Sequence, residues 1–382
     1  MKIKNLFIIK TPNTTSRKYL NDTDGVFCVH YGDIYKNYSN KFIKSSKIIN
    51  KFNFKIDKTK YIFEDSIILP DVTETISDFG HLTYIINDNN NYINGTHTFA
   101  ICSKNNNNLK YLFYYLQSKA NKKRLQSLLL GSTVFQLSLK DFNNFELKEY
   151  HSSDIQQHIV DIIGSIDDKI ENNENLILKY YDFLILNMKK LSINKTKSCI
   201  FNFEYISILK SGINKFNDEK IYIDTSCVTQ NFINDISNKI KYNKRPSRAN
   251  MQPEINTVWF AKLKNSPKHI IIKEYSDYIL NNMIFSTGFF GLKINKVKFN
   301  LLATYFISNE FDNNKNLISV GATMQSINNE DLLNMKIPNF TDNDFINFNK
   351  TSEPLFKQIE YLKIENIKLK RLKKMYLKKF FG

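Results

Sequence analysis

Four side chains that offer paired hydrogen-bonding groups stand within eight residues of one another: Arg245, Arg248, Asn250 and Gln252. Guanine exposes two acceptors in the major groove of DNA, which suit a guanidinium group, and adenine exposes an acceptor and a donor, which suit a carboxamide. Ser247 adds a hydroxyl group to the same stretch. The segment therefore has the side chains that base reading requires. The alternative is a loop whose polar groups brace its own domain.

The residues around this stretch, RPSRANMQPEINTVWFAK at 245–262, predict how it is held. A proline stands near each end of the polar part, and each proline fixes its own φ angle. Alternate side chains of an extended strand point to the same side, so we expect Arg248, Asn250 and Gln252 to lie on one side of the strand. Trp259, the only Trp of the chain, and Phe260 are expected to anchor the segment in a hydrophobic core.

Other parts of the chain also offer polar side chains for contact with DNA. Basic residues in TTSRKYL and NKKRLQ are candidates for phosphate contact, because phosphate oxygens take most of the hydrogen bonds that proteins make to DNA. Hydroxyl and amide groups follow two Gly-x-Thr turns. These candidates are Arg17, Lys18, Lys122, Lys123, Arg124, Thr133, Gln136, Thr323 and Gln325. A solvated basic face and a structural turn are the alternatives.

The overall charge agrees with a polyanionic partner. The chain has 382 residues, with 54 Lys plus Arg against 37 Asp plus Glu, which gives a formal net charge of +17. Nucleic acid is the first candidate for such a partner, and a solvated basic surface is the alternative. The four Cys residues are far apart, with no C-x-x-C pair, so we expect neither disulfides nor a zinc site. No run of about 18 apolar residues is present, and we expect a soluble, cytoplasmic protein.

The motifs that catalysis would need are missing from the sequence. There is no N-P-P-Y loop of an adenine methyltransferase, and no phosphate-binding G-x-x-x-x-G-K-[ST] motif. Asp71 and Glu74 in LPDVTET could suggest a nuclease, but no Lys follows at a useful spacing, and acidic residues at a turn are usually solvated. The six His residues show no metal-ligand spacing. We therefore expect no catalytic residue, no metal and no cofactor on this chain.

A repeat organises the chain. GSTVFQLSLKDFNNFELKEY at 131–150 returns as GATMQSINNEDLLNMKIPNF at 321–340, 190 residues later. Between and before these copies, short alternating runs such as KIYIDTSCV and DSIILPDV are separated by turn-rich segments. This pattern predicts an α+β chain with two globular domains of one plan.

A long amphipathic helix is expected after each copy of the repeat. Apolar residues recur at spacings of three and four from 155 to 191, with a short break predicted at Gly164. The second helix is expected to hold Pro354 in its first turn. Neither apolar stripe can stay in water, so we expect the helices to pack as an antiparallel pair, with Asn173 and Asn366 fixing the register. Two unrelated core helices are the alternative.

These features together resemble a known family. Over essentially its whole length, the chain resembles the DNA-specificity (S) subunit of type I restriction-modification systems. The blocks that carry the resemblance are VHYGDIY at 29–35, DSIILPDVTET at 65–75, NGTHTFAI at 94–101, IVDIIGSIDDKIENNENLI at 159–177, ISILKSGINKFNDEKIYIDTSCV at 206–228, RPSRANMQPEINTVWFAKLKN at 245–265 and YILNNMIFSTGFFGLK at 278–293. The order of the blocks and the repeat make the match specific.

The resemblance implies an architecture in which two target-recognition domains alternate with two helical regions. The implied boundaries are 1–150 for the first recognition domain, 151–193 for the central helical region, 194–342 for the second recognition domain and 343–382 for the C-terminal helix. Each domain would read one half of an asymmetric, bipartite DNA target, and the helices would set the spacing. His97 in NGTHTF then becomes a candidate for DNA contact, with a surface histidine as the alternative.

The resemblance also implies the partners. The chain would be a non-catalytic subunit on double-stranded DNA, with two methyltransferase subunits docked on its helices. Those subunits would bring S-adenosylmethionine, and restriction subunits, where a system has them, would bring ATP. Two other functions remain open at this point: an unrecognised minimal DNA nuclease, and a stand-alone DNA-binding protein without modification partners.

Overall fold

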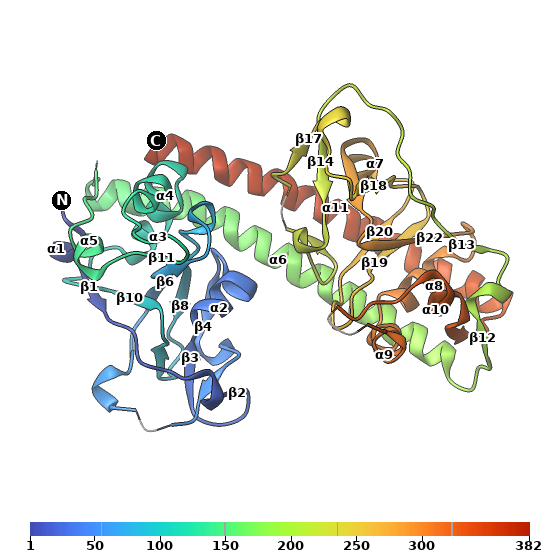
Figure 1. The fold of residues 1–382 in the computed structure, drawn as a ribbon, viewed down its shortest axis with the longest axis horizontal. Coiled ribbons are helices and arrows are strands. Elements are labelled where there is room, and N and C mark those ends of the chain that lie inside the picture. The colour runs from blue at the N-terminus through green and yellow to red at the C-terminus, as the bar shows by residue number, and fades with distance from the viewer. Residues whose placement is uncertain (55, 149, 235, 322–323) are drawn as a thin grey trace. The chain divides into compact units, whose positions relative to one another are not determined.

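The computed structural model describes residues 1–54, 56–148, 150–234, 236–321 and 324–382 (Figure 1). The chain divides into two compact units. Unit 1 comprises Met1–Lys169 and Leu369–Gly382, and unit 2 comprises Ile170–Lys368. Helices and sheets are both present in each unit, so the predicted α+β class is confirmed. No helix among the described residues is both long and apolar enough to cross a lipid bilayer.

Unit 1 is built on two sheets. The larger has the strand order β1 (Phe7–Lys10), β10 (Thr98–Ser103), β6 (Ser66–Pro70), β8 (Thr83–Ile86) and β4 (Phe42–Lys44), with only the β4–β8 pair parallel. The smaller has the order β2 (Leu20–Asn21), β5 (Lys51–Phe52), β3 (Val26–Val29) and β9 (Tyr92–Asn94). A two-stranded pair joins β7 (Val72–Thr73) to β11 (Phe135–Gln136).

Four helices of unit 1 pack on one face of its larger sheet: α1 (Ile3–Leu6), α3 (Leu109–Gln117), α4 (Lys119–Gln126) and α5 (Leu139–Asn143). The short helix α2 (Tyr31–Asp33) instead leads into Ile34, which is buried in the core on the other face. Along β6, Ile67 and Leu69 belong to the same core as α3, whereas Ile68 belongs to a core with residues of the smaller sheet. Both faces of this strand are therefore buried, which explains why DSIILPDV reads as a continuous apolar run.

Unit 2 repeats this plan with its own strands. One sheet has the order β13 (Ile206–Ile208), β22 (Phe289–Ile294), β19 (Thr257–Ala261) and β20 (His269–Ile272), and the other has β17 (Lys239–Ile240), β14 (Lys220–Ile223), β21 (Met283–Ser286) and β18 (Ala249–Met251). Two small pairs are β15 (Val228–Thr229) with β16 (Phe232–Ile233), and β12 (Lys197–Cys199) with β23 (Lys336–Pro338). The shorter helices are α7 (Asp277–Asn282), α8 (Phe299–Phe306), α9 (Asn309–Ile318) and α10 (Asn329–Asn334).

Two details show the common plan of the units. In each unit an antiparallel run, β1-β10-β6-β8 or β13-β22-β19-β20, packs against a second sheet that contains a parallel pair, β3 with β9 or β14 with β21. In each unit the last short helix precedes a long one. The internal repeat that the sequence predicted is thus visible in the strand order.

The first long helix, α6 (Ser153–Ser192), runs through Gly164 without interruption, so the predicted break is wrong. A glycine inside a helix costs about 1 kcal/mol relative to Ala. Ile159 and Ile163 are buried in the core of unit 1 before Gly164, and Ile166 is buried after it. This burial of apolar side chains on both sides of the glycine outweighs the cost.

The second long helix, α11 (Asp342–Phe381), begins twelve residues before Pro354, so the placement of this proline in the first turn is also wrong. Thr341 starts the helix, because its hydroxyl accepts the backbone N–H of Asp344 at 3.3 Å while the Asp344 carboxylate accepts the N–H of Thr341 at 2.7 Å. Phe345 and Phe348 are buried in the first turns and hold this extra segment in place.

The two long helices contact each other within each unit. In unit 2, the Asn173 amide donates to Asn366 at 2.8 Å and to Glu365 at 2.6 Å, and Lys363 donates to the Tyr181 hydroxyl at 2.9 Å. The partner number falls along α11 as it rises along α6, so this pair is antiparallel, as predicted. In unit 1, Lys373 and Asp167 form an ion pair at 2.8 Å.

The predicted anchor of the 245–262 segment is confirmed. Trp259 lies fully buried in β19, and its indole N–H donates to the Thr257 hydroxyl at 2.8 Å. Gly291 on the neighbouring strand leaves room for the ring, since a Cβ atom there would lie 2.7 Å from the indole. Phe260 points to the opposite face of the same strand, into the core that α8 covers.

Candidate nucleic-acid interface

The polar stretch of unit 2 ends in strand β18 and shows the predicted alternation. Ala249 and Met251 are buried, whereas Arg248 is exposed and Asn250 and Gln252 are half-buried. The three polar side chains therefore share the outward side of the strand. A bulge between Ala249 and Met251 bends the strand at this point, and such bulges often re-aim side chains next to functional sites.

Not every polar residue of this stretch is available to a ligand. The Arg245 guanidinium donates to the Tyr242 carbonyl oxygen at 2.7 Å and stacks on the Tyr242 ring at 4.3 Å. The Gln252 side chain accepts the backbone N–H of Asn214 at 3.3 Å. Both residues brace neighbouring turns of unit 2, while Ser247 is exposed. The exposed base-reading candidate is Arg248, with Asn250 beside it.

Arg248 has a basic neighbour that the sequence did not single out. Burial and the nearby Arg248 guanidinium together lower the pKa of Lys262, which follows β19 directly. The Arg248 guanidinium also lies against Gly288, where an added Cβ atom would be 3.0 Å from its Nη2. The only sequence signal for Lys262 was its place at the end of the segment that Trp259 anchors.

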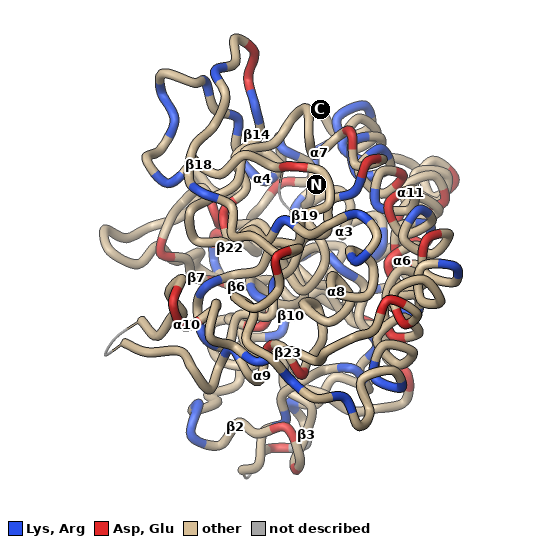
Figure 2. Tube along the Cα trace, turned by 90° about the vertical axis from the view of Figure 1, so that its right-hand side faces the viewer, with Lys and Arg blue, Asp and Glu red and all other residues tan. Residues whose placement is uncertain are grey.

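Positively charged residues are frequent in this stretch of unit 2. Residues 239–248 contain five Lys or Arg and no Asp or Glu: Lys239, Lys241, Lys244, Arg245 and Arg248. Figure 2 shows several basic residues, with one short acidic stretch, on the loops around β14 and β18, and residues of both signs along α6 and α11. A local excess of positive charge is what a phosphate backbone would attract.

The corresponding surface of unit 1 brings together three candidates that are far apart in the sequence. Arg17 donates to the Tyr31 hydroxyl at 2.8 Å, and the Tyr31 ring meets the His97 ring edge-on at 5.8 Å. His97 Nδ1 lies 3.6 Å from the Asp71 carboxylate, which accepts a hydrogen bond from the Gln136 amide at 3.2 Å. Arg17, His97 and Gln136 therefore belong to one cluster.

Tyr31 and Asp71, which link this cluster, were not among the predicted site residues. Asp71 was expected to be solvated, but it is only 4% exposed in its place between β6 and β7, whereas Glu74 is exposed as expected. Both linking residues lie inside blocks that carry the family resemblance, VHYGDIY and DSIILPDVTET. That was the signal by which they could have been found.

The backbone places Asp71 and Lys262 at equivalent positions in the two units. Asp71 accepts the N–H of Leu137 at 2.7 Å and donates its own N–H to the carbonyl of His97 at 3.1 Å. Lys262 accepts the N–H of Ile327 at 3.2 Å and donates to the carbonyl of Gly288 at 3.0 Å. Leu137 and Ile327 are 190 residues apart, which is the offset of the repeat. His97 and Gly288 thus correspond as well.

The two Gly-x-Thr turns share one geometry. Gly131 has φ +132° and Gly321 has φ +133°, and a Cβ atom at either position would strike a carbonyl oxygen three residues later, at 2.1 Å and 2.6 Å. Glycine is required at both turns. Thr133 and Gln325 are exposed, and Thr323 lies outside the described residues.

The remaining candidates of unit 1 separate into exposed and engaged side chains. Lys18 and Lys123 are exposed. Burial lowers the pKa of Lys122, whose side chain lies against Gly80. Arg124 donates to the Glu146 carbonyl oxygen at 2.6 Å and to the Asn121 side chain at 2.8 Å. Lys18 and Lys123 can meet phosphate groups, whereas Arg124 braces the unit.

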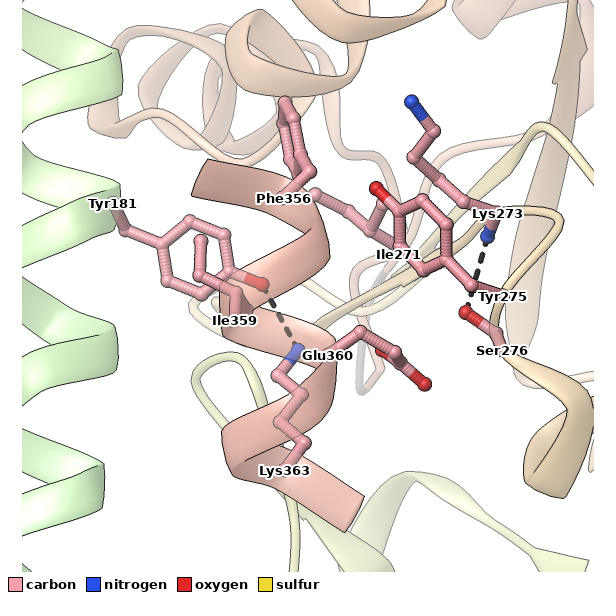
Figure 3. Close-up of a pocket in the computed structure, with 9 residues that line it drawn as sticks. All are labelled: Tyr181, Ile271, Lys273, Tyr275, Ser276, Phe356, Ile359, Glu360 and Lys363. Carbon is pink, nitrogen blue, oxygen red and sulfur yellow. Dashed lines mark hydrogen bonds between the residues drawn. The ribbon is translucent and has the colours of Figure 1, made fainter. Parts of the chain in front are cut away.

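The hollow that Figure 3 shows lies where the long helices join unit 2. It is lined by Tyr181, Ile271, Lys273, Tyr275, Ser276, Phe356, Ile359, Glu360 and Lys363. Burial raises the pKa of Glu360, and Lys273 donates to Asn300 at 2.7 Å and pairs with Glu353 of α11. These contacts fasten α11 to the globular part of unit 2.

Within the part of the chain that the structure describes, no three His, Cys, Asp or Glu side chains gather in a way that could hold a metal ion. The described polar clusters are surface clusters of donors and acceptors. Their chemistry is suited to hydrogen bonding and charge pairing with a polyanion.

Comparison with known proteins agrees with the fold. Residues 1–180 match the family model for the type I restriction modification DNA specificity domain. The crystal structure of the S subunit of a type I restriction-modification system from M. genitalium matches with a TM-score of 0.50 and 15% sequence identity, covering 100% of this chain and 95% of that one. This likeness shows the fold of the chain as a whole.

Two further structures are similar at a lower level. The HsdS subunit from Thermoanaerobacter tengcongensis matches with a TM-score of 0.33 and 13% identity over 100% of this chain and 95% of that one. A chain from a structure on the assembly and conformational transition of a type I R-M system matches with a TM-score of 0.36 and 13% identity, over 100% and 96%. No curated protein sequence matches the chain significantly.

Proposed function

We propose that this chain selects the DNA target of a type I restriction-modification enzyme, because residues 1–180 match the family model for the type I restriction modification DNA specificity domain. Each unit reads one half of a bipartite sequence. The observation that carries this proposal is the repeated plan. The two units hold different residues at equivalent backbone positions, Asp71 and His97 in one, Lys262 and Gly288 in the other. Two similar units with different contact residues suit an asymmetric target.

The long helices have the properties of a spacer between the two half-sites. Residues of α6 and of α11 belong to unit 1 at one end and to unit 2 at the other. A helix of 40 residues is about 60 Å long. We propose that the helix pair sets the number of base pairs between the two halves of the target.

The same helices offer a surface for partner subunits. Phe183 and Leu186 of α6 are 50% and 55% exposed, and Tyr361 of α11 is 63% exposed. Exposed large apolar side chains on a helix face are typical of protein contact sites. We propose that methyltransferase subunits dock on the helices, two copies because the recognition plan is duplicated, and that they supply S-adenosylmethionine. The chain itself is non-catalytic in this account, and ATP belongs to restriction subunits.

Two substitutions test base reading by unit 2. Arg248→Ala and Asn250→Ala should each lower discrimination at one half-site by about 1 to 3 kcal/mol, because a bidentate contact to a base edge is lost. Selection of bound duplexes from a randomised pool by the purified full chain measures this. The other half-site should be unchanged. Lys239→Ala, a change at an exposed cation of the same unit, is the matched control and should leave both half-sites intact.

If Arg248→Ala lowers the affinity equally for all DNA sequences, Arg248 contacts a phosphate and does not read a base.

The salt dependence of binding tests the phosphate contacts. Each phosphate that the protein neutralises should contribute about −0.9 to the slope of log affinity against log salt concentration. Lys18→Ala and Lys123→Ala should each reduce the magnitude of this slope by about one. Arg124→Ala is the control: its guanidinium is bonded inside unit 1, so this change should lower stability and leave the slope unaltered. An affinity that does not depend on salt would remove the electrostatic part of the proposal.

A further inference from the structure

His97 is an exposed member of the unit 1 cluster, and its backbone is held in an uncommon conformation. It has φ +61°, in the left-handed region, between β9 and β10. Its side chain is 47% exposed. Its carbonyl accepts the N–H of Asp71, so the backbone of one residue is tied to that of the other. The imidazole is therefore presented at a defined place, with Nδ1 toward Asp71 and the other ring nitrogen available to a ligand.

Asp71 is a buried carboxylate with an incomplete set of hydrogen bonds. Oδ2 accepts from the Gln136 amide, whereas Oδ1 is buried and has no hydrogen-bond partner. The distance from Asp71 Oδ1 to His97 Nδ1 is 3.6 Å, which is too long for a hydrogen bond. Burial raises the pKa of Asp71, because a lone charge in this place is poorly solvated. A positive charge on the imidazole would offset that cost.

The other titratable groups around His97 do not supply this charge. His30 is buried, its Nδ1 accepts the N–H of Gly32, and burial lowers its pKa. Asp33 accepts from the Asn50 amide on both oxygens. Burial raises the pKa of Tyr35, so its hydroxyl group supplies no charge here. Arg17 is the permanent cation of this cluster, and it is bonded to Tyr31 rather than to Asp71.

Unit 2 shows what occupies the equivalent place when no histidine is present. Gly288 corresponds to His97, and the Arg248 guanidinium lies against Gly288. Lys262 replaces Asp71. A permanent cation therefore lies in unit 2 at the site where unit 1 has an imidazole beside a carboxylate.

We propose that His97 is the DNA-contacting counterpart of Arg248, and that it takes up a proton from solvent when unit 1 binds DNA, with Asp71 as the positioning residue that holds the imidazolium. This inference rests on the proposed function. In the complex, Nδ1–H donates to Asp71 Oδ1, and Nε2–H donates to an acceptor on the DNA, either a phosphate oxygen or a base edge. An imidazole between a carboxylate and a second acceptor can donate a hydrogen bond from both ring nitrogens only when it is protonated.

The consequence is a pH dependence that belongs to one half of the target. If binding requires the uptake of one proton, the affinity for DNA falls by up to about tenfold for each pH unit above the ordinary pKa range of histidine. Contacts made by the Arg248 guanidinium should not change over the same range, because arginine is not deprotonated in proteins. We expect discrimination at the half-site of unit 1, or its total affinity, to fall between about pH 6.5 and pH 8, while the half-site of unit 2 is read equally well.

The test uses the purified full chain and duplexes selected from a randomised pool, with affinity measured across this pH range. His97→Gln should remove the pH-dependent part and leave the affinity near the high-pH value of the unchanged chain. Asp71→Asn should do the same, and its amide oxygen can still accept from Gln136, so the local fold is retained. His158→Gln, at an exposed histidine on α6, is the matched control and should keep the full pH dependence.

A second measurement does not depend on affinity. In NMR spectra of the full chain, the His97 ring signals should move to their protonated positions when DNA is added at about pH 7.5, and the His158 signals should not. If His97→Gln loses its preference at one base pair only, the acceptor is a base. If it loses affinity equally for all sequences, the acceptor is a phosphate. Both support the proposal.

Two outcomes would overturn it. If the unchanged chain binds DNA selectively but His97→Gln and Asp71→Asn keep its pH dependence, the role of His97 is wrong while the proposed function stands. If the unchanged chain shows no sequence preference at any pH, the proposed function itself fails, and this inference fails with it.

Discussion

Insertion of four helix-forming residues into both long helices, after Glu174 in α6 and after Ile364 in α11, should move the preferred half-sites one or two base pairs farther apart. Four residues add about 6 Å to each helix, and a base pair rises about 3.4 Å. The original spacing should no longer be bound well, because both half-sites cannot be engaged at once. The half-site sequences should stay the same, since neither polar cluster is touched. Selection from a pool with variable spacers measures the result.

The paired insertion is required by the contacts between the helices. Asn173 bonds to Glu365 and Asn366, and Tyr181 bonds to Lys363. Added residues in one helix alone would pull one of these sets out of register and leave buried amides unpaired, which costs about 1 to 3 kcal/mol for each group. The single insertion is therefore the control, and it should destabilise the chain. An active double insertion with an unchanged spacer would show that the helices do not set the distance.

Asp312→Ala should destabilise unit 2 by about 3 to 5 kcal/mol, because it leaves a buried lysine without its carboxylate. Lys315 is fully buried, with its ammonium group 3.0 Å from Asp312 and 2.9 Å from the carbonyl oxygen of Ser266. His269 lies 3.2 Å from the same carboxylate. This network joins α9 to the loop that follows β19, where Lys262 lies. Denaturant unfolding followed by Trp259 fluorescence reports on unit 2, since Trp259 is the only Trp of the chain.

A paired substitution separates the charge from the packing. Replacement of both partners, Asp312→Leu with Lys315→Met, should recover much of the lost stability, because no buried charge is left. A change of less than about 1 kcal/mol for Asp312→Ala would mean that Lys315 is solvated after the substitution and that the network does not hold the loop.

The same carboxylate should make the stability of unit 2 sensitive to acid. Burial opposes the charge on Asp312, but His269 and Lys315 outweigh it and keep the pKa of Asp312 below its ordinary value. The ionised carboxylate stabilises the folded state fully at pH values above its pKa in the unfolded chain, which is about 3.9. This stabilisation is lost as the pH falls through the lower pKa of the folded state. Asp312→Asn should therefore show less loss of stability than the unchanged chain between about pH 5 and pH 2.

The sequence predicted those features that depend on local pattern or on repetition. Alternation in β18 and the anchor role of Trp259 followed from residue order alone, and the paired asparagines followed from the duplicated helix pattern. The two errors on the helices have a common cause. Gly164 and Pro354 are unfavourable inside an isolated helix, but buried isoleucines and phenylalanines nearby hold the helical conformation, and such tertiary packing is invisible to local rules.

The cluster of unit 1 could not be predicted for a different reason. Arg17, His97 and Gln136 come from three separate segments, and the pairing of β7 with β11 is what brings Gln136 to Asp71. From residue types alone, Asp71 was predicted to be a solvated turn residue, but it is buried in the folded chain. In unit 2, Lys262 was not predicted, because its place at the end of the Trp259 segment does not distinguish it from the many other lysines of this basic chain.

We propose that this chain chooses the DNA sequence that a methyltransferase partner modifies. The most direct measurement is a base-resolution map of DNA methylation in cells that carry its methyltransferase partner, with and without this chain. We predict one asymmetric motif with two half-sites and a fixed spacer, present only with the chain, and altered in one half by Arg248→Ala. An identical methylation map in both kinds of cell would contradict the account.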